Sequence, residues 1–144
     1  MGSTERYQSM MTQLTAGNCV VLDGGTGTEI SRRGASLASW GAMATVEHPE
    51  LLGQMYREFI ECGAEVIGTN TFGASDLRLK ESGIHDREEE LNRAAVKIAL
   101  RARDEAGRDD SVLVAGSITT VGHRGPGGSQ VGDPEEERTL ESQA

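Results

Sequence analysis

Glycines and small polar residues follow three short apolar runs of the sequence. They are Asp-Gly-Gly-Thr-Gly-Thr at 23–28, Thr-Asn-Thr-Phe-Gly at 69–73 and Gly-Ser-Ile-Thr at 116–119. A carboxylate such as Asp23 can hold a substrate ammonium. The two glycines after it allow a ligand to approach the backbone closely, so that their N–H groups can bind a substrate carboxylate. Together these groups would suit an amino acid.

Each group also has a plainer interpretation. A glycine-rich segment after a strand is often only a tight turn, which Asp23 could cap. The turn lacks the third glycine of the dinucleotide fingerprint and the Lys-Ser or Lys-Thr pair of a phosphate-binding loop. Thr69 and Thr71 are good strand formers in any case. The three groups taken one by one leave both interpretations open.

The apolar runs themselves predict parallel strands. Residues 19–22, 65–68 and 111–115 are short, rich in β-branched residues and apolar without alternation, as expected of strands covered on both faces.

Helical patterns separate these runs. Pro49 suits a first helical position, and apolar residues recur at helical spacing up to a stop at Gly63. A second helix is predicted from Asp86, with Glu89 as its capping-box partner, to Gly107. A third is predicted to start at 133–136 (Asp-Pro-Glu-Glu).

The order β-α-β-α-β-α predicts the α/β class with a parallel sheet. The runs start 46 residues apart (19 to 65 and 65 to 111), more than one unit of a (β/α)8 barrel of ~250 residues. The excess lies after the strands, at 24–47 and 118–132, where functional loops occur. Parallel strands end on one face, so the three polar groups should meet at a single mouth. Three strands leave sheet edges bare, which indicates an incomplete domain or a small sheet that closes against a second copy.

Composition excludes several classes of partner. With 14 Lys and Arg against 23 Asp and Glu, the net charge of −9 argues against nucleic acid and anionic membranes. No apolar run approaches the ~20 residues that cross a bilayer, and residues 1–17 lack the apolar core of a signal peptide. Two cysteines form no disulfide framework. We expect a cytoplasmic protein.

Five segments together resemble the motifs of a known family. They are 22–29 (Leu-Asp-Gly-Gly-Thr-Gly-Thr-Glu), 32–34 (Arg-Arg-Gly), 46–51 (Val-Glu-His-Pro-Glu-Leu), 66–75 (Val-Ile-Gly-Thr-Asn-Thr-Phe-Gly-Ala-Ser) and 115–118 (Ala-Gly-Ser-Ile). In this order and at these separations they resemble the homocysteine S-methyltransferase family.

The resemblance implies a partial (β/α)8 TIM barrel. Residues 18–144 would be the N-terminal part of the homocysteine-binding barrel domain, roughly its first three βα units, and residues 1–17 an N-terminal extension. Members of the family transfer a methyl group to the sulfur of homocysteine, which gives methionine. Their donors include S-methylmethionine, S-adenosylmethionine, betaine and methyltetrahydrofolate. Their zinc, held by three cysteine thiolates from late strands, binds homocysteine as a thiolate, because coordination removes the thiol proton.

The resemblance also suggests substrate-binding residues. Asp23, Gly24 and Gly25 match residues that hold the amino and carboxylate ends of homocysteine, and Thr69 matches a further substrate contact. Asn70 and Thr71 belong to the same motif and are secondary candidates.

The zinc ligands of the family have no counterpart in this sequence. Cys19 begins the first predicted strand and Cys62 closes a helix, so both are predicted to be small packing residues. His48, His85 and His123 have no ligand spacing with another His or Cys. We therefore expect that this chain alone binds no zinc at the family site and transfers no methyl group.

Two other functions stay open at this stage. One is a non-catalytic amino-acid-binding or assembly module that has lost the metal half, and the other is a different parallel α/β enzyme with an anion-binding turn. In the long first loop, Trp40 and Met43 either contact ligand or anchor the loop, and anchoring is the expectation.

Overall fold

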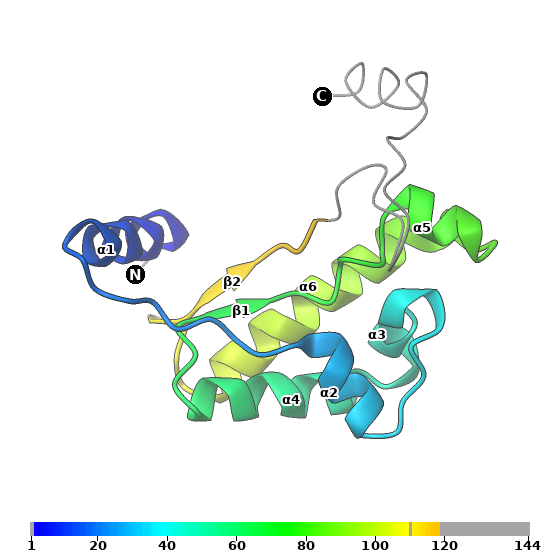
Figure 1. Cartoon of the computed structure of the whole chain (residues 1–144), viewed down its shortest axis with the longest axis horizontal. Helices are drawn as coiled ribbons and strands as arrows, with labels where there is room; N and C mark the ends of the chain where they lie inside the picture. Colours follow the sequence, from blue (N-terminus) through cyan, green and yellow to red (C-terminus); the bar gives the residue numbers. More distant parts are fainter. Residues whose placement is uncertain (1, 110, 119–144) are drawn as a thin grey trace, which may run out of the picture.

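The computed structural model describes residues 2–109 and 111–118, and Figure 1 shows how their elements are arranged. The elements, including two 3-10 turns (η), are α1 Ser3–Thr15, α2 Thr26–Arg32, η1 Ala38–Gly41, α3 Ala44–Glu47, α4 Pro49–Glu61, β1 Val66–Gly68, α5 Asp76–Glu81, η2 His85–Arg87, α6 Glu88–Glu105 and β2 Leu113–Ala115.

The three predicted runs lie side by side and run parallel, with β1 in the middle. β1 pairs with β2 in the register Val66 to Leu113, and Leu22 makes a parallel bridge to Val66. Within the described ranges the first run forms only this isolated bridge, so the strand predicted at 19–22 is reduced to one pair. The ladder is irregular because the Val21 carbonyl accepts two N–H groups, from Glu65 at 2.8 Å and from Val66 at 3.2 Å. The Glu65 carboxylate in turn accepts the Val21 N–H at 2.9 Å, in place of a backbone partner.

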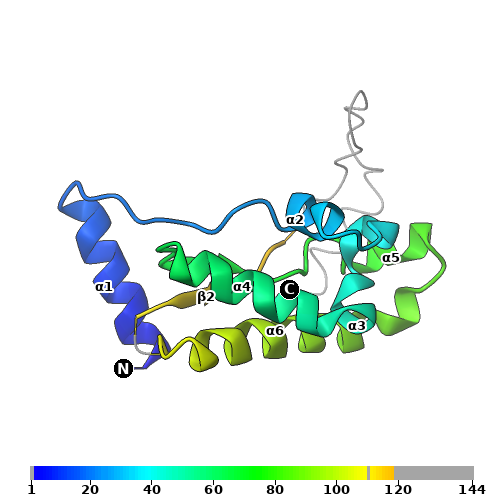
Figure 2. The same cartoon turned by 90° about the horizontal axis from the view of Figure 1, so that it is seen from below.

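Helices α4 and α6 run side by side and cover one face of these strands (Figures 1 and 2). The core between them is apolar and fully buried, and its larger members are Ile30, Leu52, Met55, Tyr56, Ile60, Ile67 and Val112. The opposite face is open in the described part of the chain, since Leu22 is 65% exposed and Val21 51%. The expectation of strands covered on both faces therefore holds for Ile67 but not for the first run.

Helix α4 matches its prediction. It begins at Pro49 and ends at Glu61, and Gly63 then takes a φ of +104°, a conformation that glycine adopts without strain.

The predicted capping box of α6 is wrong. The helix begins at Glu88, and Arg87 precedes it without a side-chain cap. Asp86 lies in the turn η2 instead. The Glu88 carboxylate accepts the Asp76 N–H at 3.1 Å, so α6 starts where it can hold the first turn of α5. Three successive glutamates also favour this helix N-terminus electrostatically.

Within the predicted N-terminal extension, residues 1–17, Ser3–Thr15 form the helix α1, which was not predicted from the sequence. It lies near the end of the sheet where the strands begin, and the Arg6 guanidinium donates to the Asp109 carbonyl at 2.7 Å (Figure 1). The helix predicted to start at 133–136 lies outside the described residues. In the part of the chain that the structure describes, no helix is both long and apolar enough to span a bilayer.

The core assignment predicts unequal effects of two alanine substitutions. Ile67→Ala, at a fully buried position of β1, should lower the free energy of unfolding by about 2–5 kcal/mol, because it leaves a cavity. Val96→Ala on the exposed side of α6, where the side chain is 38% accessible, should change it by less than about 0.5 kcal/mol. Urea unfolding of both variants measures the difference. Equal losses would contradict the proposed core.

Candidate functional site

The three polar segments meet at the edge where the strands end. The Ala115 carbonyl accepts the Thr69 N–H at 2.8 Å, which joins the second segment to the third. The Asp23 carboxylate accepts the Gly68 N–H at 2.8 Å, which joins the first segment to the second. This grouping follows from parallel pairing and agrees with the expectation of a single mouth.

A cavity of about 590 Å³ opens at this edge. It combines hydroxyl and amide groups with two aromatic rings, and its lining is Thr26, Gly27, Leu37, Ser39, Trp40, Thr69, Asn70, Phe72, Ser82 and Ser117. Of the residues predicted to bind substrate, Thr69 and Asn70 line it. Asp23, Gly24, Gly25 and Thr71 are not among its lining residues. The Asp23 carboxylate holds the N–H of Gly68, the residue before Thr69, and Gly25 precedes the lining residue Thr26.

Asp23 is partly withdrawn from water. Burial raises the pKa of its carboxyl group, and the hydrogen bonds from the N–H groups of Gly68 and of Asp23 itself oppose that rise. Its charge also acts on the hydroxyl of Tyr56, whose pKa is raised first by burial and then by Asp23. A partly desolvated carboxylate of this kind gains from a bound cation such as an ammonium group.

The two glycines after Asp23 have clear structural roles. A Cβ at Gly24 would lie 2.8 Å from a ring carbon of Phe59, so a larger residue would have to displace the Phe59 ring of α4. Gly25 occupies the N-cap position of α2. These roles leave their backbone N–H groups as the feature that a ligand carboxylate would use.

The hydroxyls of Thr69 and Thr71 form a network with the third segment. Thr71 Oγ1 donates to the Ser117 carbonyl at 2.7 Å and accepts the Ser117 N–H at 3.1 Å. The two threonine oxygens lie 2.9 Å apart. Because the Thr71 proton is already used, Thr69 is the donor of that bond. The Thr69 oxygen also accepts the Ser117 N–H at a longer 3.4 Å and keeps one lone pair for a further contact, whereas the Thr71 hydroxyl is satisfied within the protein.

Asn70 holds the loop that follows α2. Its side-chain amide, in a residue only 8% exposed, donates to the Gly41 carbonyl at 2.8 Å and to Thr45 Oγ1 at 3.1 Å. Both amide hydrogens therefore have partners in the protein, and the geometry gives Asn70 a supporting role.

Sequence reasoning did not select the aromatic wall of the cavity. The Trp40 and Phe72 rings meet edge to face with centroids 6.4 Å apart, and the Arg78 guanidinium lies 4.5 Å above the Trp40 ring. Trp40 thus lines the cavity and is also anchored. Met43 anchors the loop, since its sulfur accepts a hydrogen bond from Arg87 and it packs on a second apolar cluster. A sole tryptophan in a long loop after a strand was the available signal.

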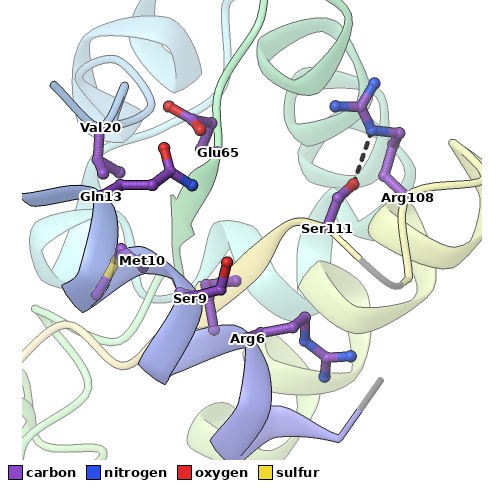
Figure 3. Close-up of a pocket in the computed structure, with 9 residues that line it drawn as sticks. Arg6, Ser9, Met10, Gln13, Val20, Glu65, Arg108 and Ser111 are labelled. Carbon is purple, nitrogen blue, oxygen red and sulfur yellow. Dashed lines mark hydrogen bonds between the residues drawn. The ribbon is translucent and has the colours of Figure 1, made fainter. Parts of the chain in front are cut away.

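A second cavity, of about 240 Å³, lies at the opposite end of the strands (Figure 3). Helix α1 forms one wall with Arg6, Ser9, Met10 and Gln13, and the rest of the lining comes from Val20, Glu65, Arg108, Ser111 and Leu113. It contains none of the predicted site residues. The cavity at the strand ends is therefore the candidate site.

The described residues do not fit a zinc site of three thiolates. The sequence contains two cysteines, and both are exposed, so the prediction that they are packing residues is wrong. Cys19 lies in the extended segment that follows the turn after α1, and Cys62 lies in the turn after α4. Across residues 2–109 and 111–118, no three His, Cys, Asp or Glu side chains are grouped so as to hold a metal ion.

Comparison with known proteins decides the family. The family model of homocysteine S-methyltransferase matches residues 20–141. The chain belongs to the homocysteine S-methyltransferase family. Betaine–homocysteine S-methyltransferase 1 from Sus scrofa is 34% identical over 124 residues, covering 83% of this chain and 43% of the relative. Selenocysteine methyltransferase from Astragalus bisulcatus is 35% identical over 127 residues, covering 74% and 38%.

Solved structures agree with this assignment. The homocysteine methyltransferase MmuM from Escherichia coli, in its metallated form, superposes with a TM-score of 0.64 at 30% identity. The match covers 76% of this chain and 41% of that one. The chain thus spans less than half the length of these relatives. The family assignment also sets aside an unrelated α/β enzyme with an anion-binding turn.

The hydroxyl network can be tested by a matched pair of substitutions. Thr71→Val keeps the shape but leaves the carbonyl of Ser117 without its donor and the N–H of Ser117 with only the longer bond to Thr69 Oγ1, at 3.4 Å. The free energy of unfolding should therefore fall by about 1–3 kcal/mol. Thr71→Ser keeps the hydroxyl and should cost clearly less. Urea unfolding and hydrogen exchange of the Ser117 amide report both. An unchanged exchange rate in Thr71→Val would contradict the network.

Proposed function

We propose that this chain forms the homocysteine-binding part of a homocysteine S-methyltransferase. The observation that carries the proposal is the Asp23 carboxylate, which is partly desolvated and fixed by the N–H of Gly68, whose neighbour Thr69 lines the cavity. Family membership names the ligand class, because the matching relatives are named for homocysteine.

In this proposal each end of homocysteine has its own group. The ammonium pairs with Asp23, the carboxylate takes the backbone N–H groups of Gly24 and Gly25, and the free acceptor capacity of Thr69 Oγ1 serves a further contact. The substrate carries both charges of an amino acid, and the site offers one partner for each. Asn70 and Thr71 hold the surrounding segments and do not contact the ligand directly.

The fold belongs to the same proposal. Three parallel segments, each followed by a loop at the same edge, support the first three βα units of a TIM barrel over residues 18–144, with α1 in the N-terminal extension. Leu22, 65% exposed on the uncovered face, is the kind of side chain that further barrel strands would bury. A cytoplasmic location stays a prediction from the sequence.

Methyl transfer is assigned to the family and not to this chain alone. Zinc supplies a homocysteine thiolate where the family site is complete, but the residues described above do not provide its ligands. The chain therefore binds the amino-acid portion of homocysteine and leaves its sulfur without activation. This outcome also suits the alternative of a binding or assembly module that acts without catalysis.

The role of Asp23 predicts a selective loss of affinity. The unmodified chain should bind homocysteine more tightly than 4-mercaptobutyrate, which lacks the amino group. Asp23→Asn should weaken homocysteine binding by about tenfold or more, so that the two ligands bind with nearly equal affinity. Isothermal titration calorimetry measures both ligands. Asp76→Asn, which removes a carboxylate paired with Lys80 on the surface, is the control. An unchanged preference for homocysteine in Asp23→Asn would refute the assignment.

The pH dependence of binding follows from the same residue. Folding raises the pKa of Asp23, so the ionised carboxylate lowers the stability of the ligand-free protein. This destabilisation disappears as the pH falls through the raised pKa. Homocysteine affinity should fall over the same interval, because the ammonium needs the carboxylate. Titrations from neutral pH downward, with Asp23→Asn as the pH-insensitive reference, test this.

Catalytic competence gives a separate test. The 144-residue chain, supplied with Zn²⁺, homocysteine and each of the four donor types of the family, should produce no methionine above background. Methionine is measured by mass spectrometry, with a complete family member as positive control. Turnover by the chain alone would show that its metal chemistry has been misassigned.

A further inference from the structure

One wall of the cavity is built from a left-handed turn. Ser39 has φ 51° and ψ 44°, Trp40 has φ 57° and ψ 30°, and Gly41 has φ 81°. Side chains of L-residues crowd the backbone in this region, which therefore admits mainly glycine and usually single residues. Three successive residues in the left-handed region, one of them a tryptophan, are stable only where contacts with the surrounding structure hold them in place. Backbone strain of this kind is common at functional sites.

The second polar segment supplies the restraint. The Asn70 amide donates to the carbonyl of Gly41, the last residue of the turn, and to Thr45 Oγ1 just beyond it. The amide thus joins the turn to the start of α3. Gly41 and Thr45 are both buried, so water cannot readily replace a hydrogen bond that Asn70 no longer makes. Losing such a bond therefore costs free energy.

Gly73, in the same polar segment as Asn70, allows a second close contact with the left-handed turn 39–41. A Cβ at Gly73 would lie 2.7 Å from the Ser39 carbonyl oxygen and 2.8 Å from Trp40 Cβ. Only glycine permits this approach, because backbone atoms cannot move aside as a flexible side chain can. Residues 70 and 73 therefore hold the turn between them.

The position of the turn determines the shape of the site. Leu37, Ser39 and Trp40 line the cavity together with Thr69 and Ser117. The Trp40 ring is 47% exposed and touches Phe72 and Arg78, so its place depends on the backbone that carries it.

We propose that Asn70 is a positioning residue, which holds the strained turn 39–41 so that Trp40 forms a wall of the binding cavity; for its ligand the proposal rests on the homocysteine site proposed above. Asn70 acts through Gly41 and Thr45 and leaves the ligand to other groups. Its two amide hydrogens are both occupied by these partners.

The sole tryptophan of the chain allows a direct test. Asn70→Asp keeps the size of the side chain but replaces both donors by acceptors, so the turn should be released. Acrylamide quenching of Trp40 in the ligand-free protein should then rise clearly, and homocysteine affinity should fall about tenfold, the loss expected for a buried hydrogen bond. Far-UV circular dichroism and the urea midpoint check that the rest of the fold is kept.

Thr45 provides the matched controls and a second route if Asn70→Asp does not fold. Thr45→Ser keeps the acceptor hydroxyl and should leave quenching unchanged, whereas Thr45→Val removes it and should raise quenching. Weaker homocysteine binding with unchanged quenching in Asn70→Asp would make Asn70 a direct ligand and overturn the proposal, as would equal quenching in the two Thr45 variants. If the unmodified chain binds no homocysteine, the proposed function fails, yet the quenching data still decide the role of Asn70.

Discussion

The parallel pairing of β1 with its two neighbours is the constraint on which the rest of the structure depends. It brings together three segments that are 46 residues apart in sequence, because parallel strands end at the same edge. The pairing continues past the strands through side chains. The Asp23 carboxylate replaces a ladder partner for the Gly68 N–H, and the Thr71 hydroxyl does the same for Ser117. Backbone pairing and site geometry are therefore one network, and a change at the strand ends affects both.

Several residues of the family motifs hold neighbouring segments of the site together. Gly24 makes room for Phe59, and Asn70 and Gly73 hold the left-handed turn. Arg33 bridges Glu29 of α2 and Glu58 of α4. Asp23 and Thr69 are different, because the first carries a partly desolvated charge and the second keeps acceptor capacity. Motifs of this kind consist mainly of residues that hold the backbone in place, and few of their side chains remain free to bind a ligand.

Charge is used sparingly in this site. None of the residues that line the cavity is ionisable, and the Asp23 carboxylate is connected to its edge through Gly68, the residue before Thr69. A neutral lining with one adjacent anion favours a ligand whose positive end is small and whose remainder is polar or weakly apolar. Several acidic residues of the described helices form ion pairs at the surface.

The sequence by itself determined the parallel order, helix α4, the meeting of the three polar segments and the family, because these follow from local patterns and from motif order. It did not determine the start of α6 or the short pairing of the first run, since the bonds there depend on partners distant in sequence, such as Glu88 with Asp76 and Val21 with Glu65. The helix α1 was not predicted either, although its capping bond, from the Gly2 N–H to Glu5, is local. Nor could it separate Asn70 from Thr69. Only the tertiary structure shows that the Asn70 amide donates both of its hydrogens, to Gly41 and Thr45, whereas the Thr69 hydroxyl can still accept a hydrogen bond. The reason is that the partners of these groups are their neighbours in space and not in sequence.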